Sequence, residues 1–220
     1  MIENRNIRQR DLIPPEQLED TQVTIVGVGA IGRQLAIQLA AIGVGRLKLI
    51  DFDTVEPENL APQGFLENDL GLKKVVAVSH VCGAINSEIQ IQIVDGKFNL
   101  LDFTSGILMC CVDSIETRKR IFESTKNKFE IFIDGRMSAE FMRVLTAHDD
   151  KSKEFYRGEL FPANEAHQGA CTAKSTIYCA SIAAGIMVAQ FAKWLRGIRP
   201  LDCDIQLNTL TNEMLAKSCN

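Results

Sequence analysis

The chain has 220 residues, of which 46% are hydrophobic and 24% are charged, so it can bury one large core and has no compositional boundary between two domains. Its formal net charge of −4 and its sequence pI of about 5.5 exclude a broadly basic face for nucleic acid. Any phosphate-binding site must therefore be local.

Apolar runs alternate with helix-length periodic segments from Gln22 to Asp134. This alternation is typical of an α/β fold with a mostly parallel sheet flanked by helices. The expected strands are residues 22–26, 46–51, 89–94, 106–112 and 130–134, and the expected helices are residues 31–42, 72–85, 114–126 and 177–195.

The pattern changes after Gly135. Residues 139–149 alternate like a half-buried strand, which predicts an antiparallel extension of the sheet. The charged run that begins at Asp149 predicts a mobile crossover loop over residues 149–172, and loops of this length are often functional. We expect one domain over residues 1–220.

The N-terminus and the cysteines indicate a compartment. The first twenty residues carry charges throughout and lack the apolar core of a signal peptide. The longest apolar run, Ile177–Ala189, is shorter than the roughly 20 residues that span a bilayer, so we expect a cytoplasmic protein that is not bound to a membrane. Seven cysteines without a Cys-x-x-Cys pair favour reduced thiols over disulfides or a structural zinc site.

A glycine motif lies between the first predicted strand and the first helix. Gly27, Gly29 and Gly32 form G-x-G-x-x-G, which lets the backbone approach a phosphate at a helix N-terminus. Asp51 ends the second predicted strand, where an acid accepts hydrogen bonds from ribose hydroxyls. The order indicates a Rossmann-like nucleotide site that suits NAD as well as ATP, and a purely structural tight turn is the alternative.

The residues after Asp51 favour a triphosphate. Asn59 and Gln63 follow in an acidic, turn-rich segment, and "DLGLKK" supplies Lys74. An NAD-dependent dehydrogenase needs no such series beside its ribose, whereas cleavage of a triphosphate needs cations and a metal-holding carboxylate. Asp113 is placed at the end of a strand to be that carboxylate, although it could also cap the next helix.

Several ordered motifs together carry a resemblance. They are "NRN", "VGVGAIG", "AIGVGRLKLIDFDTVEPENL", "DLGLKK" and "CCVDSIETR". The chain resembles the MoeB/ThiF adenylating enzymes and the adenylation domains of ubiquitin-activating enzymes over most of residues 4–114, and again from Cys171 onward. The resemblance implies a single ThiF-type domain that uses ATP and Mg²⁺ to adenylate the C-terminal carboxylate of a small ubiquitin-like or sulfur-carrier protein ending in glycine.

The resemblance also implies roles for individual residues. Asp51 would hold the ribose, Asp113 would bind Mg²⁺, and Arg5 would reach across a homodimer into the neighbouring site. The nucleotide-binding set would comprise Gly27, Gly29, Gly32, Asp51, Asp53, Asn59, Gln63 and Lys74. One departure is Pro62, which stands where the family has an arginine; Lys73, Arg8 or Arg10 could replace that cation.

Cys171 is the candidate nucleophile. It precedes a Thr, as in ubiquitin-activating enzymes, and a helix N-terminus and Lys174 nearby would favour its thiolate. A thiolate could accept the acyl group as a thioester. The alternative is a passive loop cysteine, and His167 is either a base for it or a solvated loop residue.

The other cysteines are expected to have no catalytic role. Cys82, Cys110, Cys111 and Cys179 lie in apolar surroundings and are predicted to be core residues, with adjacent Cys110 and Cys111 on opposite faces of a strand; Cys203 and Cys219 receive no role. Arg136 and Arg143 either line a surface for the partner's tail or pair with acids.

The leading hypothesis is a homodimeric activating enzyme in a bacterial ubiquitination-like pathway, with a ubiquitin-conjugating-like enzyme receiving the thioester. Sulfur transfer is the other possible fate of the adenylate. An NAD-dependent oxidoreductase and a non-catalytic subunit of an activating complex are the alternatives from other classes.

Overall fold

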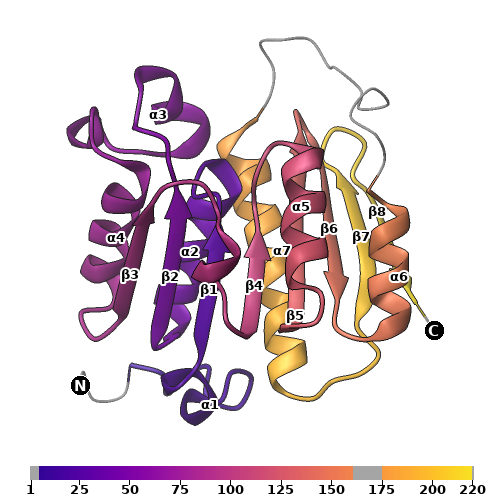
Figure 1. The fold of residues 1–220 in the computed structure, drawn as a ribbon. Coiled ribbons are helices and arrows are strands. Elements are labelled where there is room, and N and C mark those ends of the chain that lie inside the picture. Colours follow the sequence, from indigo (N-terminus) through magenta and orange to yellow (C-terminus); the bar gives the residue numbers. More distant parts are fainter. Residues whose placement is uncertain (1–4, 161–174, 220) are drawn as a thin grey trace.

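The computed structural model describes residues 5–160 and 175–219, which form one eight-stranded sheet with helices on both faces (Figure 1). The strands are β1 (Gln22–Val26), β2 (Arg46–Asp51), β3 (Gln90–Asp95), β4 (Gly106–Cys110), β5 (Phe129–Ser138), β6 (Phe141–Ala147), β7 (Asp202–Asn208) and β8 (Glu213–Ser218). The helices are α1 (Pro15–Glu19), α2 (Ala30–Ile42), α3 (Pro57–Gln63), α4 (Lys74–Ile85), α5 (Ile115–Thr125), α6 (Asp150–Gly158) and α7 (Ile177–Leu195).

The strand order is β3-β2-β1-β4-β5-β6-β7-β8. β1 to β5 pair in parallel, and β6, β7 and β8 pair antiparallel, so the predicted Rossmann-like sheet with an antiparallel extension after Gly135 is confirmed. The chain leaves β1 toward β2 on one side, and β4 lies on the other side. In an open α/β sheet this switch in direction leaves a crevice at the carboxyl ends of the two strands, where ligands bind.

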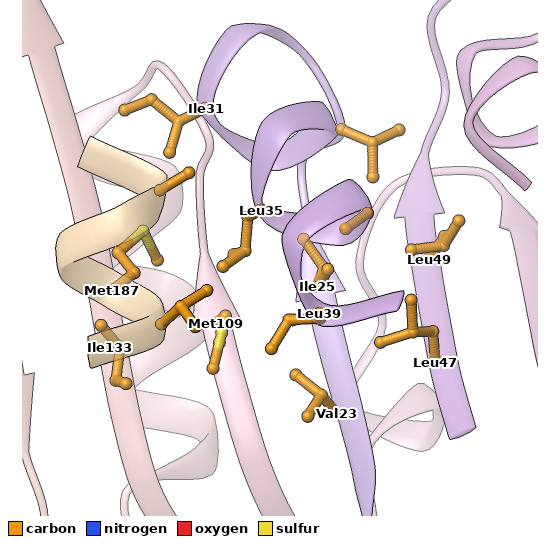
Figure 2. Packing of buried hydrophobic residues seen from close by; sticks show 14 of the residues in the cluster. Val23, Ile25, Ile31, Leu35, Leu39, Leu47, Leu49, Met109, Ile133 and Met187 are labelled. Carbon is orange, nitrogen blue, oxygen red and sulfur yellow. The ribbon is translucent and has the colours of Figure 1, made fainter. Parts of the chain in front are cut away.

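Two hydrophobic clusters cover the two faces of the sheet. α2, α4 and α7 bury their apolar residues against one face, as Figure 2 shows for Leu35 and Leu39 of α2 against Ile25 of β1. The aromatic cluster on the other face packs α5 and α6 against the sheet, with Phe122 and Phe132 at its centre. The inner parallel strands β1 and β4 are covered on both faces, so they have nearly continuous apolar sequences, which made them predictable.

α6 corrects the expectation of a loop that begins at residue 149. Asp149 caps this helix by accepting a hydrogen bond from the Ser152 backbone N–H at 2.8 Å, and Ser152 and Tyr156 are buried one turn apart. The segment is therefore an amphipathic helix whose exposed charges had suggested a loop. Residues 161–172 of the expected crossover loop lie outside the described residues.

α7 begins and ends where the apolar pattern predicts. Its 19 residues are long and apolar enough to cross a membrane by length and composition. The helix instead packs along α2 and against β5 and β6, with Met187 and Phe191 fully buried. This environment is that of a core helix.

A disulfide joins Cys203 of β7 to Cys219, next to the end of β8. The expectation that all cysteines are reduced is wrong for this pair, because antiparallel pairing of the two strands brings residues 16 positions apart in the sequence to a Cα separation of 5.8 Å. The pairing of β7 with β8 was not predicted, so nothing in the sequence placed these two thiols together.

Asp134 is the centre of a buried polar network. Its carboxylate has no solvent exposure and accepts hydrogen bonds from Arg118, from Arg136 Nε at 2.8 Å and from Tyr156 Oη at 2.9 Å. Arg118 also donates to the carbonyl oxygens of Val112 and Gly135. The network ties β5 to the start of α5 and to α6.

We predict that Asp134→Ala lowers the free energy of unfolding by about 3–5 kcal/mol, because it leaves two buried guanidinium groups without their shared counter-charge. Urea unfolding of the purified variant would measure this loss. Glu130→Ala, at an exposed position of the same strand, is the control and should change stability by less than about 0.5 kcal/mol. Equal losses in the two variants would contradict the proposed importance of the network.

Candidate functional site

The glycine loop joins β1 to α2 at the crevice between β1 and β4. Gly27 has φ of +86°, and a Cβ built on it would lie 2.8 Å from the Cys111 carbonyl oxygen. A Cβ on Gly32 would lie 1.9 Å from the Gly27 carbonyl oxygen. Both positions therefore require glycine, and the turn that they form directs the N-terminus of α2 into the crevice.

Gly29 and Gln63 face each other across this loop. Gly29 precedes the first residue of α2, and a Cβ on it would lie 3.5 Å from Gln63 Oε1. That oxygen is buried and has no hydrogen-bond donor in the part of the chain that the structure describes. Buried polar atoms without a partner are rare in folded proteins, so Gln63 presents an unused acceptor directly over the glycine loop.

Asp51 connects the loop to the end of β2. Its carboxylate accepts hydrogen bonds from Val28 N at 2.7 Å and from Asp53 N at 2.9 Å. An ionised carboxylate can accept about four hydrogen bonds, so capacity for a ligand hydroxyl remains. The predicted ribose-binding acid therefore also holds the glycine loop in place.

Lys74 begins α4 beside this loop, and its side chain is only 8% exposed. Its Nζ lies 2.9 Å from Asp53 Oδ2. A cation is unfavourable at a helix N-terminus because the helix dipole is positive there. The ion pair with Asp53 offsets this cost at the buried position of Lys74.

Lys73 caps the same helix and is already paired. Its Nζ lies 3.0 Å from Asp95 Oδ1 and donates to the Phe52 carbonyl oxygen at 2.9 Å. The site therefore holds two adjacent lysines with different environments, since Lys73 is partly exposed and Lys74 is buried.

α3 lies above the carboxyl ends of the strands and carries Asn59 and Gln63 (Figure 1). Asn59 Oδ1 accepts a hydrogen bond from the Glu56 N–H at 3.0 Å, which caps the helix, so its amide nitrogen is available to a ligand. None of the residues of α3 is buried. Pro62 lies in the last turn and offers no side-chain charge.

Asp113 follows β4 at the same edge of the sheet and is exposed. Ser114, not Asp113, caps α5, since Ser114 Oγ accepts from Thr117 N at 3.3 Å. The alternative role of Asp113 as a helix cap is therefore wrong. Within the described residues no group of three or more His, Cys, Asp or Glu side chains is arranged to hold a metal.

Arg5 lies at the opposite end of the molecule. It donates to the carbonyl oxygens of Ile85, Ala40 and Ala41, at the C-terminal ends of α4 and α2. α2 has 13 residues and is therefore roughly 20 Å long, which separates Arg5 from the glycine loop of its own chain. A role of Arg5 in a neighbouring subunit remains a prediction.

The cysteines of the described residues are mostly core residues, as predicted. Cys82, Cys110 and Cys179 are fully buried. Burial raises the pKa of Cys82 to about 12, and it also raises the pKa of Cys110 above that of a free thiol. Cys111 belongs to the opposite face from Cys110 and has a raised pKa for the same reason. Cys171 and His167 lie outside the described residues.

Arg136 and Arg143 pair with acids, which was one of the two alternatives for them. Arg136 contacts Asp134, and Arg143 makes two hydrogen bonds of 2.8 Å with Asp204. Sequence reasoning did not single out Arg33, a buried arginine in the first turn of α2. Its spacing of three and seven residues from Ala36 and Ala40 was the available signal, because it places Arg33 on the buried face of the helix.

The doubly wound sheet, the glycine turn at its switch point and the acid that ends β2 define a Rossmann-like α/β protein with a phosphate-binding type of loop. Within that class, the chain belongs to the ThiF family, whose model matches residues 4–218.

Curated relatives include ubiquitin-like modifier-activating enzyme 5 from two organisms. The protein from Caenorhabditis briggsae is 28% identical over 139 residues, which cover 56% of this chain and 32% of the relative. The protein from Drosophila erecta is 32% identical over 123 residues, which cover 48% of this chain and 31% of the relative. The matched region thus spans about a third of the length of these relatives.

Solved structures share the fold at low sequence identity. PaaA superimposes with a TM-score of 0.78 at 20% identity, covering 99% of this chain and 73% of that one. Escherichia coli MccB with ATP superimposes with a TM-score of 0.76 at 18% identity, covering 99% and 72%.

We predict that Arg5→Ala lowers the free energy of unfolding by about 1–3 kcal/mol, because carbonyl groups at two helix ends lose a charged donor. Chemical denaturation would measure the loss. Arg8→Ala, at an exposed neighbouring position, should stay near the wild type. An unchanged stability of Arg5→Ala would show that these hydrogen bonds contribute little in solution.

Proposed function

We propose that this protein binds ATP with Mg²⁺ and adenylates the C-terminal carboxylate of a small carrier protein. The observation that carries the proposal is the buried cation of Lys74, which pairs with Asp53. The Asp51 carboxylate accepts hydrogen bonds both from Asp53 N and from Val28 N of the glycine loop. A triphosphate needs a fixed cation there, whereas NAD carries no 2′-phosphate on its adenosine ribose and needs no cation beside it. The family membership of the chain supports the same assignment.

The described residues fit a nucleotide. The glycine loop has no side chain to block a phosphate, and the buried Gln63 Oε1 lacks a donor that a ligand hydroxyl or a metal-bound water could supply. Asp51 would take the ribose, while Asn59 and Lys74 would contact the phosphates. Asp113 is exposed at the same edge and would be the protein ligand of Mg²⁺, which often binds through one carboxylate and substrate phosphates.

When bound, ATP supplies an α-phosphate that the carboxylate of the carrier attacks, with loss of pyrophosphate. The protein's part is to neutralise charge and to align the reactants. Lys74 is preorganised for this by its hydrogen bond to Asp53, so little reorganisation is needed when a phosphate arrives. Asp51 keeps the backbone N–H groups of the loop in position by accepting from Val28.

The carrier is proposed to be a small ubiquitin-like or sulfur-carrier protein with a C-terminal glycine. The names of the curated relatives support a ubiquitin-like protein, and one solved MccB structure contains MccA. In the proposed continuation, the Cys171 thiolate attacks the carbonyl carbon of the acyl adenylate, forms a thioester and releases AMP. The acyl group then passes to a conjugating enzyme in a bacterial ubiquitination-like pathway.

A homodimer is part of the proposal. Because Arg5 is engaged with helix ends of its own chain, a contribution to the neighbouring site would require it to exchange those hydrogen bonds. Arg8, three residues on, is exposed and makes no ion pair with the described residues, so it is the second candidate for that role. We place the protein in the cytoplasm, and the Cys203–Cys219 disulfide is the observation that opposes this location.

The first test is nucleotide binding by titration calorimetry. We predict that the protein binds Mg-ATP and not NAD.

We also predict that Lys74→Ala and Asp113→Ala each lose about two to three orders of magnitude in the rate of carrier-dependent pyrophosphate exchange, the usual scale for one preorganised electrostatic group. Lys126→Ala, which removes a surface lysine away from the site, is the matched control. Tight NAD binding without a response to Mg-ATP would establish the oxidoreductase alternative, and ATP binding without exchange would favour a non-catalytic subunit.

A second prediction concerns the thioester. Cys171→Ala should retain ATP binding and pyrophosphate exchange, because the nucleotide site is built from other residues, but it should form no thiol-sensitive adduct with the carrier. Intact mass and non-reducing gels would detect the adduct. Cys82→Ala and Cys179→Ala are the controls, and an adduct that persists in Cys171→Ala would identify this thiol as a bystander.

A further inference from the structure

Arg33 is a buried arginine next to the glycine loop. It lies in the first turn of α2, where its backbone N–H donates to the Gly29 carbonyl oxygen at 2.9 Å, and it is only 5% exposed. Its guanidinium carbon lies 5.2 Å from the centre of the Phe65 ring. A Cβ on Gly64 would lie 3.3 Å from Arg33 Nη1, so the guanidinium reaches the residue that follows Gln63.

The guanidinium has no acceptor among the described residues. Its Nε is buried without a hydrogen-bond partner, and no described carboxylate lies within 4.0 Å of it. Arg118, which is equally buried, instead contacts Asp134. Burial lowers the pKa of Arg33, and the charge of Asp69 only partly opposes that effect. An unpaired buried cation is costly, and an anionic ligand would relieve that cost.

The surroundings indicate which anion would bind. Gln63 Oε1, one residue from Gly64, is a second buried polar atom without a partner, and it lies over Gly29. The two unsatisfied groups therefore flank the turn between α3 and Phe65, and Gln63 Oε1 lies beside the glycine loop. An oligophosphate suits the guanidinium, because its oxygens accept hydrogen bonds in the fork geometry that arginine offers.

We propose that Arg33 is a phosphate-binding residue of this site, whose guanidinium contacts the triphosphate and supplies the cation that Pro62 does not. This inference rests on the proposed function, since it assumes that a triphosphate binds at the glycine loop. Lys73 is the weaker candidate because Asp95 and the Phe52 carbonyl already occupy its ammonium group. Arg10 lies in the N-terminal segment with Arg5, at the other end of α2, and it faces Asp11.

The test combines stability and affinity in Arg33→Met, which keeps the length of the side chain and removes its charge. The ligand-free variant should unfold at the same temperature as the wild type or higher, since an unpaired buried charge is gone. Its affinity for pyrophosphate and for ATP should fall by about 10- to 100-fold, the scale for losing a charged hydrogen-bond donor. Arg33→Lys should recover part of that affinity, and calorimetry measures all three proteins.

Arg46→Met is the matched control. Arg46 also has a buried Nε without a partner, but it begins β2 at the amino end of the sheet and pairs with Asp20 at 3.5 Å. Its removal should leave both affinities unchanged. If Arg33→Met fails to fold, Arg33→Gln and Arg33→Lys give the same comparison of neutral with charged side chains.

The outcomes separate this inference from the proposed function. Two results would overturn the phosphate contact without contradicting ATP binding by the wild type. In the first, Arg33→Met keeps the wild-type affinity. In the second, Arg33→Met and Arg33→Lys lose the same affinity and both unfold at lower temperatures. Binding of pyrophosphate that depends on Arg33, in a protein that does not bind ATP, would support the contact and contradict the proposed function. A wild type that binds neither ligand would refute both.

Discussion

The close approach of Gly32 to the Gly27 carbonyl oxygen is the constraint on which the site depends. A Cβ at Gly32 would lie 1.9 Å from that oxygen, and one at Gly27 would meet the backbone after β4 at 2.8 Å. These contacts press the start of α2 against the ends of β1 and β4. The unpaired N–H groups of the helix therefore face the crevice, and the Asp51 hydrogen bond to Val28 extends the same constraint to β2.

The charged side chains discussed above fall into three arrangements, which differ in burial and in whether the charge is already paired. The Asp134 carboxylate is buried and accepts hydrogen bonds from three side chains, so its network stabilises the fold. Lys74 and Asp53 form a pair at the carboxyl edge of the sheet, in which the ammonium group is buried and the carboxylate is half-exposed. Arg33 is buried and unsatisfied within the described residues, which is the arrangement that an anion would complete.

The N-terminal segment stabilises the helix ends at the opposite edge of the sheet from the glycine loop. Arg5 closes the C-terminal ends of α2 and α4, where unpaired carbonyl groups and the negative end of each helix dipole favour a cation. One helix, α2, therefore has its glycine loop at one end and this arginine at the other. The stability of the segment and the position of the loop are linked through the same helix.

By itself, the sequence determined the local elements and the glycine turn. β1, β2 and α7 have the predicted bounds, because buried strands and a long core helix have continuous apolar patterns that depend on few distant residues. Gly27, Gly29, Gly32 and Asp51 lie together because the order of strand, turn, helix and strand fixes their geometry.

Only the tertiary structure decided which charges are buried and which strands pair at the C-terminal edge. α6 appeared as a charged loop because its buried face consists of Ser152 and Tyr156 rather than aliphatic residues. The Cys203–Cys219 bridge depends on the register of β7 with β8, and the difference between Arg118 and Arg33 depends on whether a carboxylate lies nearby. These contacts join residues far apart in the chain, so local periodicity carries no information about them.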